Sequence, residues 1–460
     1  MGPSLADKQS PRLIAWLLIF LYFSFLYNYG AKVSALLYTD FPAYFYGARA
    51  VFVDKHSPYD EQALTRAANT MEPPKLFEPP RRIYPYLYPP PSLLMFYPLV
   101  KAPVGHTDEQ RVQFARAALL AANHLCLLFI IYVVLVPIAG FTLKEIFALI
   151  LPAFLAIYLV YSNGTLSTIN LGQVNLIVLA LLCLAWWGLK RGWPAWAIAL
   201  PLGIACVFKI YPVLFLGLLV IRRRFGAALA TAGVLVAICA VAAMVLPREL
   251  WHEWATKVLP TGGYLKSPLG VFPPTLAGNV GVAGFMSRLF LPPRLGMEAN
   301  LPPPGKALLH YESLGRLLTY GVVAAITLIT LLATFISART KDLAPAERQR
   351  RLNLEFAGLL VLTFLVAPLA WEHHLAYVTP AVVIALLTVL RDRPELSNRW
   401  LAPAMLLVAC ILGWPMAFGK LPIPRVLAIL VIGVKFYAVM ALWLFLIWQM
   451  ATGRRAAAAG

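Results

Sequence analysis

The sequence contains few charged residues. Only 13% of its 460 residues are Asp, Glu, Lys or Arg, whereas 60% are hydrophobic. A soluble domain carries about 25% charged and about 45–50% apolar residues. So few charges cannot cover the surface of a soluble protein of this length. The composition therefore excludes an ordinary soluble enzyme and predicts an integral membrane protein that crosses the bilayer many times.

Motifs for several kinds of site are also missing. The five cysteines all lie inside apolar runs, where a cysteine behaves as a small hydrophobic residue. The sequence therefore indicates neither a disulfide framework nor a CxxC redox or zinc motif. It contains no Asp-x-Asp pair and no HExxH motif, so it does not support a nucleotide-sugar site or a metalloprotease.

Long apolar runs make up most of the chain. A span needs about 20 predominantly apolar residues, and runs of that kind predict an all-α polytopic membrane protein with about twelve transmembrane helices. Two of them, 193–208 and 210–221, are short enough to form one re-entrant pair. The first apolar run of the chain, 13–30, is interpreted as an uncleaved span, because many other spans follow it. The expected spans are 13–30, 113–138, 143–161, 173–189, 193–208, 210–221, 225–246, 314–337, 354–369, 374–390, 400–418 and 424–450.

The distribution of Lys and Arg predicts the orientation. The formal net charge is +19, and many basic residues lie in short loops such as IRRRF at 221–225. Short basic loops stay in the cytoplasm, so both termini are expected there. Two long extracytoplasmic segments then result, 31–111 and 247–312, together with short outer turns near 162–172, 209–212, 368–374 and 419–425. The tail 452–460 is expected to be disordered. Because the basic residues are dispersed, a nucleic-acid partner is not expected.

One carboxylate follows the first apolar run directly. It is Asp40, in the stretch LYTDFPAYFYGARA at 37–50. Apolar residues recur at helical spacing from Phe41 to Phe52, which predicts an amphipathic helix lying flat on the outer membrane face. Two roles remain open for Asp40. It caps this helix, or it is a general base held just above the lipid headgroups.

Five motifs occur in order along the chain. They are Asp-Phe at 40–41, Tyr-Pro-Pro at 88–90, Gly-Gln-x-Asn in NLGQVNLIVLALL at 170–182, Lys-x-x-Pro within 203–225, and Trp-x-His-His in APLAWEHHLAYVTPA at 367–381. Together they resemble glycosyltransferase family 87. The resemblance implies a GT-C-type fold, with interfacial helices in the first outer loop.

The resemblance also implies an activity. Known members of the family include polyprenol-phosphate-mannose-dependent mannosyltransferases and arabinofuranosyltransferases of cell walls. We therefore expect an inverting glycosyltransferase that moves a hexose, with mannose as the expected sugar. Its partners would be a polyprenyl-phosphate-linked sugar donor, a lipid-linked or glycan acceptor, and membrane lipids. We expect it in the bacterial plasma membrane, with its active site on the extracytoplasmic face.

The reaction indicates which residues act. Asp40 is the candidate base for the acceptor proton, and Lys209 is the candidate cation for the leaving phosphate. Alternatively, Lys209 extends to the lipid headgroups. Adjacent helical residues point about 100° apart, so one of His373 and His374 is expected to bind phosphate or sugar. The other would then face headgroups or solvent; His374 is preferred for the site.

Three further polar residues are weaker candidates. Gln173 and Asn175 either line the donor site or simply begin a helix, and Glu253 is a reserve base. A monophosphate leaving group carries modest charge, so we expect neither a metal nor another cofactor.

Two departures from the family pattern concern the acceptor. Gly281 stands where a Ser-type residue is expected in GNVGVAGFMSRLF at 278–290, and MEPPKLFEPPRRI at 71–83 is an extra piece. Two alternative functions remain. A transporter or flippase would place ionisable groups at the midplane, whereas here the polar residues lie at the outer rim. A polyprenyl-diphosphate-dependent polymerase or ligase would need more outer cations.

Overall fold

The structure is a computed structural model. It describes residues 40–72, 82–102, 107–146, 149–292, 309, 311–339, 343–392, 400–415 and 425–452. The predicted first span at 13–30 and nearly all of the predicted tail lie outside these residues, as do parts of both long outer segments.

The described residues form helices and no strands. An isolated bridge joins Asn279 and Trp371. Short 3-10 and π turns extend or connect several of the helices. The α-helices are α2 (Phe41–Arg49), α3 (Glu61–Met71), α4 (Leu93–Lys101), α5 (Asp108–Val133), α6 (Leu143–Ile146), α7 (Ile150–Tyr161), α8 (Asn163–Leu171), α9 (Asn175–Arg191), α10 (Ala195–Phe208), α11 (Phe215–Ile221), α12 (Phe225–Val245), α13 (Arg248–Glu253), α14 (Val282–Phe290), α15 (Glu312–Ala338), α16 (Pro345–Leu365), α17 (Thr379–Leu387), α18 (Leu401–Gly413), α19 (Arg425–Ile432) and α20 (Val434–Thr452).

Six helical stretches of the described chain are long and apolar enough to cross a membrane. Three shorter apolar helices accompany them, and two of these, Ala195–Phe208 and Tyr211–Ile221, form the pair on either side of Lys209. The chain is therefore an all-α membrane protein, while the count of twelve spans stays a prediction. The six stretches are Asp108–Ile138, Ile150–Leu171, Phe225–Val245, Glu312–Ala338, Glu372–Asp392 and Val434–Thr452.

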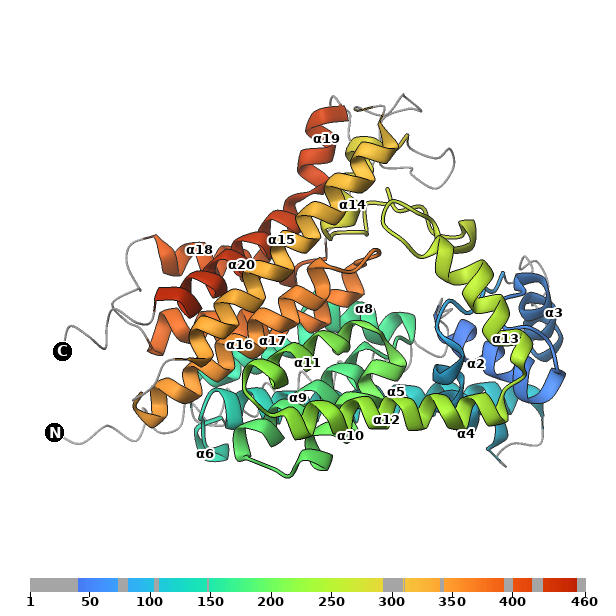
Figure 1. The fold of residues 1–460 in the computed structure, drawn as a ribbon, viewed down its shortest axis with the longest axis horizontal. Helices are drawn as coiled ribbons and strands as arrows, with labels where there is room; N and C mark the ends of the chain where they lie inside the picture. The colour runs from blue at the N-terminus through green and yellow to red at the C-terminus, as the bar shows by residue number, and fades with distance from the viewer. Residues whose placement is uncertain are drawn as a thin grey trace.

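The long helices α12 and α15 diverge from each other (Figure 1). Both contact α11, and from there α15 runs toward α14 while α12 runs toward α13. The helices differ in burial: in the most apolar 18-residue window, 94% of the residues are buried in Glu372–Asp392, but only 11% in α12. The former is thus a central helix, whereas α12 presents most of its apolar surface outward.

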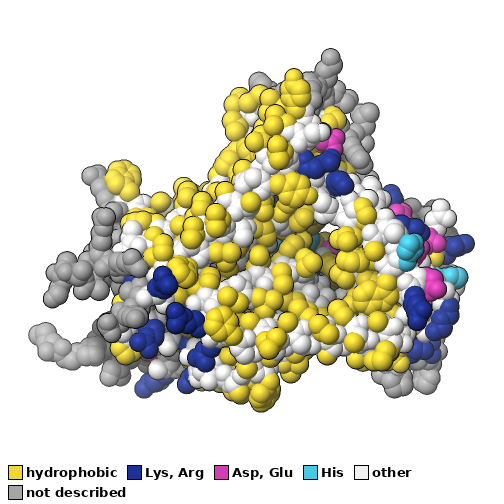
Figure 2. All heavy atoms as spheres, viewed as in Figure 1, with side chains coloured by type: hydrophobic (Ala, Val, Ile, Leu, Met, Phe, Trp, Pro, Cys, Tyr) yellow, Lys and Arg dark blue, Asp and Glu magenta, His cyan; other side chains and the backbone are white. Residues whose placement is uncertain are grey.

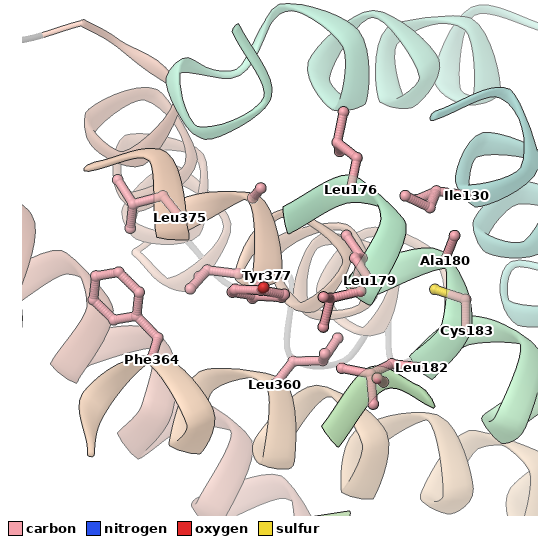
Figure 3. Close-up of a cluster of buried hydrophobic side chains, with 14 of the residues drawn as sticks. Ile130, Leu176, Leu179, Ala180, Leu182, Cys183, Leu360, Phe364, Leu375 and Tyr377 are labelled. Carbon is pink, nitrogen blue, oxygen red and sulfur yellow. The ribbon is translucent and has the colours of Figure 1, made fainter. Parts of the chain in front are cut away.

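A cluster of apolar side chains lies between α9, α16 and the segment that leads into α17. Figure 3 shows Leu179 of α9 near Leu360 of α16 and Tyr377, and all three are buried. Lipid tails are as apolar as leucine, so van der Waals packing rather than removal from water holds such helices together. This cluster therefore packs against the segment that carries the His pair.

Two expectations about the segments between the predicted spans need correction. Residues 162–172 were expected to form a turn, but α8 occupies most of this stretch. The helix at Phe41 was expected to lie flat on the membrane, yet α2 is buried from Phe41 to Ala48. Its tyrosines are also packed against other helices: Tyr44 stacks on Phe96 of α4 with ring centroids 4.7 Å apart. With apolar or aromatic side chains on every face, α2 belongs to the interior.

Candidate active site

A cavity of about 710 Å³ lies among residues 40–89, residues 254–278 and the ends of several helices. Its size is that of a typical small-molecule site. Of the residues proposed from the sequence, Asn175 and Glu253 do not line it. The proposed residues that do line it are Asp40, Gln173, Lys209, His373 and His374.

Asp40 immediately precedes α2 but does not cap it. Its side chain makes no capping hydrogen bond, and its own backbone N–H donates to the carbonyl of Leu171 at 3.1 Å. The interpretation of Asp40 as an N-cap is therefore wrong. Burial raises the pKa of Asp40, while a hydrogen bond with Gln173 and the positive charge of Lys209 oppose this rise. The carboxyl group thus makes no capping hydrogen bond to α2, and it lines the cavity.

Lys209 is buried beside the cavity. It follows the last residue of α10 in an extended conformation, and its side chain is only 5% exposed. Its Nζ donates to the hydroxyl of Tyr88 at 3.2 Å and lies 3.3 Å from Nε2 of His374. The Tyr88 ring centroid is 5.1 Å from the same Nζ, a cation–π distance. Lys209 therefore does not extend to the headgroups, and that alternative is wrong.

Both histidines of the Trp-x-His-His motif face the interior. They lie in a 3-10 helix, Glu372–Tyr377, and both are buried and line the cavity. Their rings are 4.4 Å apart at 76°. The expectation that one of them faces headgroups or solvent is wrong. The tighter 3-10 turn and the packing of α8 across it enclose both side chains.

Gln173 and Asn175 have different places. Gln173 lines the cavity, and its Oε1 accepts a hydrogen bond from Tyr44 at 2.5 Å. Asn175 is the first residue of α9 and is fully buried. Its Nδ2 donates to the backbone carbonyl of His373 at 3.2 Å, and Tyr377 donates to its Oδ1 at 3.1 Å. Asn175 thus holds the His segment in place without lining the cavity.

A known protein family matches much of this chain. The model of glycosyltransferase family 87 matches residues 86–368, more than half of the chain. The chain belongs to glycosyltransferase family 87. The matched region of this family 87 member includes Gln173 and Lys209, whereas Asp40 precedes it and His373 follows it. No curated protein is found to match the chain.

Family membership makes this protein a glycosyltransferase that acts on a sugar donor and an acceptor. Glu253, the reserve base, does not line the cavity of this family 87 member. Its carboxylate accepts hydrogen bonds from Ser57 and from Lys257. Burial raises the pKa of Glu253, but these two hydrogen bonds outweigh it and hold the pKa below its usual range. The proposal of Glu253 as a base loses its support.

Sequence reasoning missed several residues that line the cavity of this family 87 member. Tyr44 and Tyr88 share a hydrogen bond of 3.0 Å between their hydroxyls and connect the surroundings of Asp40 to those of Lys209. Glu372 stands inside the Trp-x-His-His motif but was not selected. Its position beside His373 could have indicated that it lines the cavity. Tyr44 gave no signal, because it lies among other aromatics in a helix.

Glu372 is held by two partners from distant helices. Its Oε1 accepts from Lys435 of α20 at 2.7 Å, and its Oε2 accepts from Asn163 of α8 at 2.7 Å. Lys435 is only 1% exposed. A buried ammonium needs such a partner, because an unpaired buried charge is costly. The pair therefore anchors the first residue of the His segment to both α8 and α20.

Two glycines allow close approaches beside the cavity. At Gly164 of α8, a Cβ would lie 2.3 Å from the backbone nitrogen of Ala376. At Gly281, where a Ser-type residue was expected, a Cβ would lie 2.6 Å from the Cβ of Ala370. Side chains at these positions would push apart the segments that carry the site. The departure at Gly281 therefore has a packing reason in this family 87 member.

Proposed function

We propose that this protein is an inverting glycosyltransferase that moves a hexose, mannose in the first instance, from a polyprenyl-phosphate donor to a lipid-linked or glycan acceptor. The observation that carries the proposal is a single cavity that holds a carboxylate, Asp40, together with a buried ammonium, Lys209, and an imidazole, His374. One proton acceptor and one anion-binding group are the two requirements of sugar transfer from a phosphate.

The reaction then proceeds by one displacement. Asp40 takes the proton from the acceptor hydroxyl, whose oxygen forms a bond to the anomeric carbon of the donor. The bond from that carbon to the phosphate oxygen breaks, and the phosphate leaves with the electron pair. Lys209, supported by Tyr88 and His374, stabilises the phosphate. Because the acceptor attacks opposite the leaving group, the configuration at the anomeric carbon inverts.

The apolar surroundings of the cavity support a lipid-linked donor. Figure 2 shows hydrophobic side chains along α12 and α15 and a hollow between these helices. Two of the lining residues, Ile210 and Leu259, are large apolar side chains that are 62% and 55% exposed. A phosphate bound at Lys209 would leave a hydrocarbon chain next to this apolar surface, which suits a donor that stays in the bilayer.

The charge pattern supports the proposed side of the membrane. Lys and Arg gather at the end of the molecule where α6 lies, while acidic, basic and His side chains are mixed at the end of α3 and α13 (Figure 2). Basic ends face the cytoplasm. We therefore propose a site on the extracytoplasmic face of a bacterial plasma membrane, with both termini on the opposite side.

Product formation tests the proposal. Purified protein in lipid nanodiscs is incubated with radiolabelled polyprenyl-phosphate mannose and a total lipid extract, and in parallel with labelled GDP-mannose. We expect label in a new lipid or glycan only with the polyprenyl-phosphate donor. Label from GDP-mannose would contradict the donor class. Movement of intact donor across the bilayer without any transfer would contradict the transferase.

A further inference from the structure

A row of three aromatic side chains lines the cavity. Tyr84 comes from the first outer segment, Phe272 from the second, and Trp371 from the segment before the His pair. The ring centroids of Tyr84 and Phe272 are 4.9 Å apart, and those of Phe272 and Trp371 are 6.0 Å apart. Three segments far apart in sequence thus contribute to one aromatic surface.

Packing does not bury this aromatic surface completely. All three side chains are only partly buried and line open space. The neighbouring tyrosines differ: Tyr44 and Tyr86 are 2% and 0% exposed and belong to the core. The faces of the aromatic row are therefore available to a ligand.

A fixed carboxylate adjoins the row. Glu372 follows Trp371 directly and lines the same cavity. Its two oxygens each accept one hydrogen bond, from Lys435 and Asn163. A carboxylate has about four acceptor sites, so Glu372 retains capacity to accept hydrogen bonds from a ligand's hydroxyl groups.

The chemistry of this surface selects its ligand. The face of an aromatic ring is electron-rich and attracts weakly positive C–H groups, and a carboxylate binds hydroxyls but repels phosphate. A sugar ring presents both a C–H face and hydroxyl groups, whereas a hydrocarbon tail offers no donor for Glu372. The cation of the proposed phosphate site, Lys209, donates to Tyr88, which shares a hydrogen bond with Tyr44.

We infer that Tyr84, Phe272, Trp371 and Glu372 form a carbohydrate subsite that holds a sugar ring of the acceptor. The inference rests on the proposed transferase function and deepens it. It commits the acceptor to a glycosylated molecule, in which a ring stacked on the aromatic row directs one hydroxyl toward the base. An acceptor without sugar would leave this surface unused.

The test uses variants that remove the stacking surface. Trp371→Leu and Phe272→Leu each replace an aromatic ring of the row by an aliphatic side chain. The matched control is Tyr97→Leu, because Tyr97 is 44% exposed and pairs with Phe52 at 4.9 Å outside the cavity. All preparations are kept in nanodiscs free of sugar-based detergent, and their melting temperatures are compared to confirm folding.

Two readouts separate the subsite from the transferase. Saturation-transfer NMR with methyl α-D-mannopyranoside should show contacts to ring C–H protons in wild type and in Tyr97→Leu. We expect roughly five- to tenfold weaker apparent binding in Trp371→Leu. Equal signals in all variants, or no signal in wild type, would overturn the subsite.

The same preparations are then assayed for transfer from labelled polyprenyl-phosphate mannose. A rise in KM for the acceptor at unchanged KM for the donor supports the inference. A rise in the donor KM alone would overturn it, because the row would then bind the donor. Absence of transfer with an intact NMR signal contradicts the transferase but supports a carbohydrate site.

Discussion

The ammonium of Lys209 lies 3.3 Å from Nε2 of His374, although the two residues belong to different helical segments. A lysine ammonium has only donors, so Nε2 of His374 is the acceptor that suits a charged Lys209. The contact fixes the direction of both side chains at the cavity wall. A phosphate placed against this pair would meet a charge that is already oriented.

Removing the positive charge at position 209 should reduce transfer strongly. In the proposed reaction, Lys209→Met removes the cation that stabilises the leaving phosphate, and we expect the transfer rate to fall about 10²–10³-fold. Lys209→Arg should retain part of the rate, since the charge remains. Initial rates with labelled polyprenyl-phosphate mannose measure both. Lys257→Met is the control, because Lys257 lies outside the cavity and is exposed; a similar loss in this control would contradict the role of Lys209.

The rate of transfer should depend on pH through Asp40. Burial raises the pKa of this carboxyl above the ordinary pKa of an aspartate, and the base must be ionised to accept a proton. Activity should therefore fall with decreasing pH, at a higher pH than for an exposed Asp. A profile of kcat/KM against pH checks this. An acid limb at the ordinary pKa of Asp would show that burial does not govern this group.

Much of the site could be predicted from sequence, because its residues stand in local motifs at the starts and ends of apolar runs. Lys209 interrupts an apolar stretch, where a charge is costly and so indicates function. The burial of both His373 and His374 could not be predicted. It depends on the approach of α8, which the sequence suggested was a turn, and on a 3-10 rather than an α-helical backbone.

The burial of α2 also could not be predicted from the sequence. Helical periodicity correctly predicted a helix after Asp40, but periodicity cannot tell whether a tyrosine faces water or a neighbouring helix. Tyr44 finds a stacking partner in Phe96 and a hydrogen-bond acceptor in Gln173. These partners come from distant segments, so only the tertiary structure reveals that α2 is an interior helix.

The contact of α8 with the His segment should not tolerate a side chain at position 164. In Gly164→Ala, the new Cβ would lie 2.3 Å from the Ala376 nitrogen, and backbone cannot move aside as a flexible side chain can. We expect a loss of about 3 kcal/mol in stability and reduced transfer. Gly233→Ala in α12 is the control, because nothing lies within 4 Å of its Cβ position. Melting temperatures measure both; equal shifts would contradict the close approach.

Removing one partner of the ion pair between Lys435 and Glu372 should destabilise the protein more than removing both charges. Lys435→Met leaves the carboxylate of Glu372 without its counter-charge, and we expect a loss of about 3 kcal/mol, because Glu372 is partly exposed. The double variant Lys435→Met with Glu372→Gln removes both charges and should recover much of the stability. Melting curves of the single and double variants form the comparison. A double variant less stable than the single one would contradict the pairing.

The central claim is that Asp40 takes the acceptor proton. The most direct measurement compares single-turnover transfer from labelled polyprenyl-phosphate mannose in wild type and Asp40→Asn, with donor binding measured on the same nanodisc samples. We predict that transfer falls about 10²–10⁴-fold while donor binding persists, since Asn keeps the shape of the side chain. Transfer at the wild-type rate with Asn at position 40 would contradict the claim.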